Sequence, residues 1–83
     1  MREILDDKEM IVLIPIKLNT IADLKEFSGV ASDLPCDTIL TSGTYRIDAK
    51  SFFGILSLDL NKTIILEVCS KYQDKFEKWY SEV

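Results

Sequence analysis

The sequence predicts an α+β fold in which three helices cover one face of a four-stranded antiparallel sheet. Short runs rich in β-branched residues, typical of strands, alternate with stretches whose apolar residues recur at helical spacing. A serine–glycine pair between two of the runs is typical of a tight turn between antiparallel strands. The expected order is strand, helix, strand, strand, helix, strand, helix. We expect a single domain over residues 1–83, with an N-terminal extension at 1–9.

The first half of the chain begins with the apolar run Met10–Ile16, which predicts a strand. Pro15 lacks a backbone N–H, so this strand is expected at an edge of the sheet. A helix is expected over about 20–32. Its start has the pattern of a capping box, because the Thr20 hydroxyl can accept from a first-turn amide and Asp23 suits the positive end of the helix.

The second half is expected to contain a hairpin, a short helix, a strand and a last helix. The hairpin strands lie near residues 37–41 and 44–47 and flank Ser42-Gly43, since glycine accepts a positive φ angle. Ser51 can cap the short helix 51–57, and Thr63–Val68 is rich in β-branched residues. Ser70 opens the last helix, whose aromatic residues are spaced to face the core: Tyr72, Phe76, Trp79 and Tyr80.

Composition restricts the classes of function. The 83 residues are 47% hydrophobic and 29% charged, as in a globular protein. The formal charge of −4 argues against direct nucleic-acid binding. The longest apolar run is too short to span a bilayer and follows a charged stretch, so we expect neither a membrane segment nor a signal peptide but a cytoplasmic protein. Cys36 and Cys69, without histidine or a CxxC pair, do not predict a metal site.

The segment 48–58 is the most specific part of the sequence. Ala49-Lys50-Ser51, Gly54 and Ser57-Leu58 resemble the helix around the regulatory serine of HPr, the small phosphocarrier of the bacterial sugar phosphotransferase system. The resemblance runs through most of the chain after Met10 and implies a sheet with strand order 1-4-2-3. An outer first strand agrees with the inference from Pro15.

The phosphocarrier site of that family is expected at the start of the first helix. The resemblance places Ile21 at the position of the phosphorylated histidine and Asp23 at that of an arginine. Isoleucine has no nucleophilic atom, and a carboxylate repels phosphate. The chain has no histidine at all. We therefore expect no histidine phosphotransfer, no enzymatic activity and no cofactor.

Ser51 has two compatible roles. Its hydroxyl can cap the short helix, and the resemblance also makes it a candidate regulatory phosphoserine. A phosphorylatable serine without the histidine is similar to the catabolite-repression paralogue of HPr, a co-regulator of a transcription factor. The partners that the resemblance implies are thus a serine kinase and a transcriptional regulator.

Two apolar surfaces are candidates for binding a protein. Phe52, Phe53 and Leu56 match positions at which HPr presents apolar side chains to its partners, so a regulatory or adaptor protein is one hypothesis. The alternative is that two of these three residues pack inward.

The second surface is the outer face of the sheet, with Ile11, Leu13 and Pro15 on the first strand and Ile65 on the last. An apolar outer face predicts an oligomerising or structural module, which would bind a partner or a second copy of this chain through that face. Alternatively, Ile4 and Leu5 of the extension fold back over this face.

If the second and fourth strands are antiparallel neighbours, Cys36 and Cys69 also meet at one end of that pair.

Overall fold

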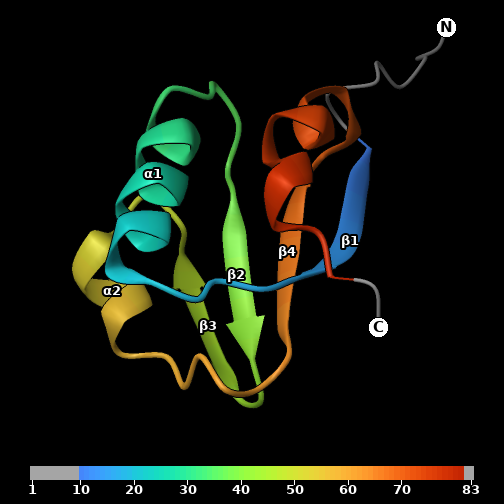
Figure 1. The fold of residues 1–83 in the computed structure, drawn as a ribbon. Helices are drawn as coiled ribbons and strands as arrows, with labels where there is room; N and C mark the ends of the chain where they lie inside the picture. The colour runs from blue at the N-terminus through green and yellow to red at the C-terminus, as the bar shows by residue number, and fades with distance from the viewer. Residues whose placement is uncertain (1–9, 82–83) are drawn as a thin grey trace, which may run out of the picture.

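The computed structural model describes residues 10–81, so the expected extension at 1–9 lies outside the described residues. The elements follow the predicted order (Figure 1). They are β1 (Ile11–Ile16), α1 (Ile21–Ser32), β2 (Ile39–Ser42), β3 (Tyr45–Asp48), α2 (Phe52–Leu56), β4 (Ile64–Cys69) and the 3₁₀ helix η2 (Ser70–Trp79).

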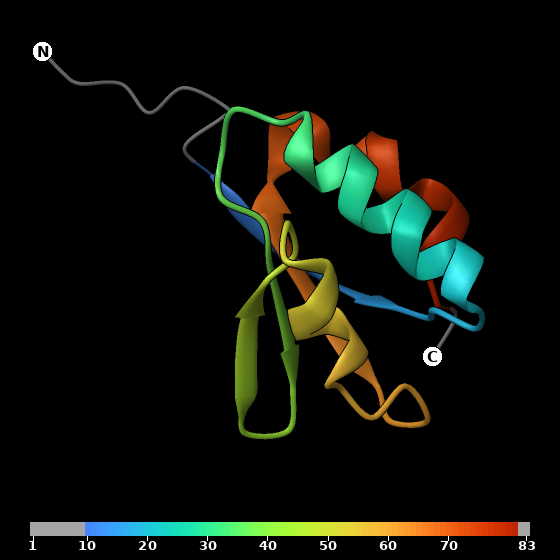
Figure 2. The ribbon, with the colours of Figure 1, turned by 90° about the vertical axis from the view of Figure 1, so that its left-hand side faces the viewer.

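The sheet has the strand order β1-β4-β2-β3, and all neighbouring strands are antiparallel, which confirms the predicted fold. Leu66, in the middle of β4, lies opposite Ile14 of β1 and Leu40 of β2. The three helices lie on one side of the sheet, as Figure 2 shows with the sheet nearly edge-on. The opposite face of the sheet carries no helix of the described chain.

The core fills the layer between the sheet and the helices. Burying apolar side chains there supplies most of the driving force for folding. Every described element except β3 contributes a buried apolar side chain. The largest fully buried apolar side chains of the core are Phe27, Phe76, Ile16, Leu18, Leu24, Leu40, Ile55, Ile64, Leu66 and Val68.

The ends of the elements follow local sequence. The predicted capping box of α1 is confirmed, because the backbone N–H of Asp23 donates to Thr20 Oγ1 at 3.1 Å and the Asp23 carboxylate accepts from the N–H of Thr20 at 3.3 Å. The β2–β3 turn lies one residue later than predicted. Ser42 pairs with Tyr45, and Gly43 occupies the first turn position with φ +61°, as in the type II′ hairpins that fit the twist of the strands.

The last helix differs from the prediction of a helix with α-type spacing. It is a 3₁₀ helix, in which residues three apart line one side, and Phe76 and Trp79 both enter the core accordingly. Tyr80 was predicted to continue the buried aromatic stripe, and this is wrong. It follows the helix, pairs with Ile16 as an isolated bridge and is exposed, with its hydroxyl donating to the carbonyl of Gln73 at 2.8 Å.

Candidate functional site

Helix α2 is positioned by the turn that follows β3. The carboxylate of Asp48 accepts from the backbone N–H of Lys50 at 2.9 Å, and its carbonyl accepts from the N–H of Ser51. Ser51 is the N-cap of α2, as predicted, and its Oγ accepts from the N–H of Gly54 at 3.2 Å. These bonds satisfy backbone donors that the helix start would otherwise leave free.

Gly54 permits a close approach inside α2. A Cβ atom at this position would lie 3.1 Å from Ser51 Oγ and 3.6 Å from Ile47 Cδ1 of β3. The missing side chain therefore lets the helix sit against its own cap and the edge strand.

Loss of the Ser51 cap gives a small but measurable prediction. We expect Ser51→Ala to lower the free energy of unfolding by about 1 kcal/mol, because the N–H of Gly54 loses its acceptor. Chemical denaturation checks this value. Lys50→Ala is a matched control on the neighbouring side chain, which makes no hydrogen bond or ion pair with the described residues. An equal loss in both variants would contradict the capping role.

The four apolar residues of α2 divide into two pairs, each three positions apart. Phe52 and Ile55 face the core, Ile55 fully and Phe52 in part. Phe53 and Leu56 face outward, with 82% and 41% of their surfaces exposed. Among the described aromatic rings, the ring of Phe53 contacts only that of Phe52, at a centroid distance of 5.9 Å and an interplanar angle of 61°.

We call Phe53 and Leu56, with Phe52 beside them, the α2 surface. The structure contradicts the alternative that two of these three residues pack inward. Only Phe52 packs against the core, whereas Phe53 and Leu56 are exposed. Helix α1 lies next to α2 on the same side of the sheet (Figure 1). The hydroxyl of Ser28 in α1 donates to the carbonyl of Lys50 at 3.2 Å and joins the two elements.

The start of α1 is where the resemblance to HPr would place the phosphorylated histidine. Ile21 is the first residue of the helix and its side chain is exposed. Asp23 accepts from the backbone N–H of Asn19 at 3.1 Å as well as from Thr20. A carboxylate thus already occupies the helix start, where a phosphoryl group would otherwise be favoured.

The titration of Asp23 gives a prediction for acid stability. Hydrogen bonds from the N–H groups of Asn19 and Thr20 hold the pKa of Asp23 below its ordinary value of 3.8, despite some desolvation. Since the folded-state pKa is the lower one, the stabilisation is complete above pH 3.8 and is lost as the pH falls through the lowered pKa. We expect Asp23→Asn to remove this part of the acid dependence in denaturation curves between about pH 2 and 5. An unchanged dependence would contradict the assignment.

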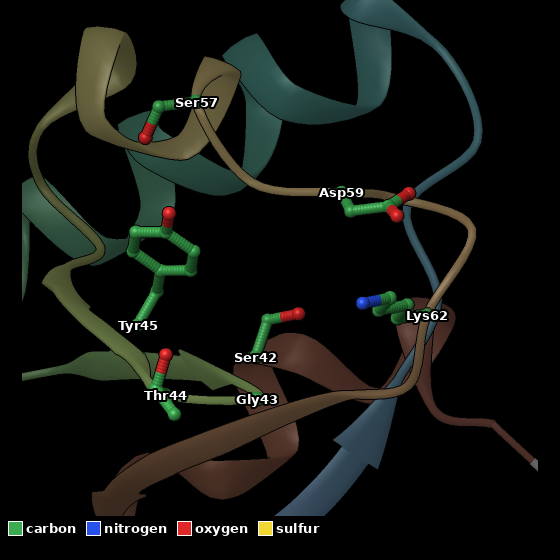
Figure 3. Close-up of a pocket in the computed structure, with 7 residues that line it drawn as sticks. All are labelled: Ser42, Gly43, Thr44, Tyr45, Ser57, Asp59 and Lys62. Carbon is green, nitrogen blue, oxygen red and sulfur yellow. The ribbon is translucent and has the colours of Figure 1, made fainter.

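A polar hollow of about 300 Å³ lies beside α2 and was not foreseen from the sequence. Tyr45 and Ser57 turn their hydroxyl groups toward it, and Lys62 reaches it from the loop before β4 (Figure 3). Two of the polar side chains that line the hollow already bond to residues close in sequence. Ser57 Oγ donates to the carbonyl of Gly54 at 2.6 Å, and the Asp59 carboxylate accepts from the N–H of Asn61 at 3.0 Å. We therefore assign this hollow no chemistry.

The two cysteines come together at one end of the sheet, as the strand order predicted. Both are free thiols. Burial, followed by a hydrogen bond with Cys36, raises the pKa of Cys69 to about 11. Cys69 is therefore a protonated thiol at neutral pH and a poor nucleophile. Within residues 10–81, no cluster of three or more metal-binding side chains occurs.

The outer face of the sheet carries the other predicted residues. Ile11 and Leu13 of β1 are exposed, whereas Val12 and Ile14 pack against the core, as the alternation of the strand predicted. Ile65 is half-buried on β4, opposite Pro15. The structure thus places Ile11, Leu13 and Ile65 on the face away from α2, and the two candidate surfaces are separate.

The fold defines the class of an open-faced α+β sandwich, with one sheet face covered by helices. No family model, no curated protein and no solved structure matches this chain. Among residues 10–81, no helix is long and apolar enough to cross a lipid bilayer.

Proposed function

We propose that this chain is a non-catalytic relative of the HPr phosphocarriers that binds a protein partner through the α2 surface. The observation that carries the proposal is the exposure of Phe53, at 82% of its surface, on a helix already anchored by Ile55. A phenyl ring that adds nothing to the core is costly to leave in water. Aromatic side chains exposed in this way are typical anchors of protein interfaces.

The fold supports the relation to HPr without carrying it alone. The strand order and the three helices on one face are those that the resemblance implies. The start of α1 supports the non-catalytic part of the proposal, because Ile21 offers no nucleophile and Asp23 is engaged in the capping box. The proposed role is that of a regulatory or adaptor protein in a bacterial cytoplasm.

Ser51 is the proposed switch of this surface. Its side chain is exposed, lies two residues from Phe53 and accepts a bond from Gly54. A phosphate on Ser51 would add a charge of about −1.5 to −2 at the border of an apolar patch, which changes the partners that the patch accepts. The proposed partners are a serine kinase and a transcriptional regulator.

Incubation of the chain with an HPr-type serine kinase and ATP tests the switch. We expect one phosphate per chain, lost in Ser51→Ala and retained in Ser57→Ala. Ser57 is a matched control, because it is an exposed serine at the other end of the same helix. Absence of phosphate in the native chain, or equal incorporation into Ser51→Ala, would overturn the role of Ser51. Partner binding by the α2 surface is tested separately, by Phe53→Ala.

A further inference from the structure

One edge of β1 is open, and the hydrogen bonds of this strand show which of its residues direct their backbone N–H and C=O groups toward that edge. The N–H of Ser81 donates to the carbonyl of Pro15 at 3.0 Å, and the N–H of Lys17 donates to the carbonyl of Trp79 at 2.8 Å. Both bonds point away from β4. On the other side, the carbonyl of Met10 accepts from the N–H of Ser70, which follows β4, at 2.8 Å.

In an antiparallel pair, successive residues direct their N–H and C=O groups alternately toward one neighbour and the other. The even-numbered residues of β1 therefore bond to β4, and the odd-numbered residues face the open edge. This phase explains why Pro15 is tolerated, since its missing N–H removes no bond to β4. It also leaves the N–H and C=O groups of Ile11 and Leu13 at the open edge, beyond the reach of the Tyr80–Ser81 segment.

The same two residues expose apolar side chains. Ile11 is 56% and Leu13 64% exposed, and Leu13 is the most exposed large aliphatic side chain of the described chain. Proteins that stay monomeric commonly protect an edge strand with a charge, a proline or a covering segment. In β1, Pro15 and the Tyr80–Ser81 segment protect one end only, and no charged residue lies within the strand.

We propose that β1 pairs with β1 of a second copy of this chain, antiparallel about a two-fold axis at Val12. This register places Ile11 of one copy opposite Leu13 of the other. Because both residues direct their backbone groups outward, each of the two such pairs makes two hydrogen bonds. The contact is self-complementary and uses the one free edge of β1 in each copy, so it closes at a dimer with a continuous sheet.

The charges near the contact fit a second copy. Among the described strand residues, Glu67 is the acidic one nearest to this contact in register, because it lies opposite Leu13 on β4. Its carboxylate is paired with Arg46 at 3.1 Å and accepts from Thr41 at 3.3 Å. Next to Leu13, the apolar contact is therefore bordered by a carboxylate that is already paired. With a formal charge of −4 per copy, the dimer should strengthen as salt is added.

Sedimentation equilibrium over a wide concentration range tests the proposal. We expect a weak monomer–dimer equilibrium, since pairing of short edges buries less area than a stable interface requires. Leu13→Lys should make the protein monomeric without unfolding it, because this side chain is largely exposed. Leu13→Pro should do the same through the backbone alone, as it removes an N–H that faces the open edge.

Leu56→Lys on the α2 surface is the matched control and should keep the dimer, because α2 lies on the helix-covered side of the sheet, away from the exposed side chains of β1. A monomer at every concentration would overturn the proposal and would leave residues 1–9 or another protein as the occupant of the edge. A dimer that survives Leu13→Lys, or one that Leu56→Lys abolishes, would also overturn it. Each result is independent of whether the α2 surface binds a partner.

Discussion

Phe27→Ala is expected to lower the free energy of unfolding by about 3–5 kcal/mol, the largest effect of the changes considered. Phe27 is fully buried in α1, and its ring lies 4.9 Å from that of Phe76 and 5.0 Å from that of Trp79 between centroids. The substitution removes these ring contacts between α1 and η2 and leaves a cavity. A domain of this size has little stability in reserve, so a large share of the variant should be unfolded at 25 °C.

The control for this prediction is the same substitution at Phe53. Because this ring is exposed, Phe53→Ala should change the free energy of unfolding by about 0.5 kcal/mol or less. Urea denaturation followed by circular dichroism measures both variants. Similar losses at the two positions would mean that Phe53 belongs to the folding core, and the proposal for the α2 surface would lose its basis.

Phe53→Ala is expected instead to weaken binding of a protein partner by about 30-fold or more, the effect of losing an interface anchor worth about 2 kcal/mol. Leu56→Ala should have a smaller effect, because half as much of its surface is exposed. With an HPr-type serine kinase as the partner, the ratio kcat/KM for phosphorylation measures the loss. Leu13→Ala, which also removes an exposed apolar side chain, should leave the ratio unchanged.

The elements of the fold could be predicted because several local signals agreed, whereas the strand order was expected from the resemblance to HPr. Pro15 indicated an edge strand, Thr20 and Asp23 marked the start of α1, and the alternation along β1 identified its two faces. These signals rest on a missing donor, on hydrogen bonds between residues close in sequence, and on the alternation of side chains along a strand. Such features are fixed locally and depend little on the rest of the molecule.

The nature of the last helix could not be predicted in the same way. The spacing of Phe76 and Trp79 fits both an α-helix and a 3₁₀ helix. The structure selects the second, and Tyr80 leaves the helix to pair with Ile16, a residue more than sixty positions away. Tertiary pairing of this kind is not visible in a local pattern.

The candidate site was predicted in its residues but not in its orientation. A short helix with four apolar side chains has to expose some of them, and the sequence does not say which. The packing of α2 against β3 and α1 decides this by turning Ile55 inward and Phe53 outward. The open edge of β1 likewise required the phase of its hydrogen bonds, which the bonds to Ser81 and Trp79 supply.

The most direct test of the α2 surface is an NMR titration of the isotope-labelled chain with an unlabelled HPr-type serine kinase. The account predicts that the amide signals of Ser51–Leu56 shift or broaden as kinase is added, while those of β1 stay unchanged. Phe53→Ala should suppress these changes at the same kinase concentration. Changes confined to β1, or equal changes with and without the Phe53 ring, would contradict the claim that this helix is the docking site.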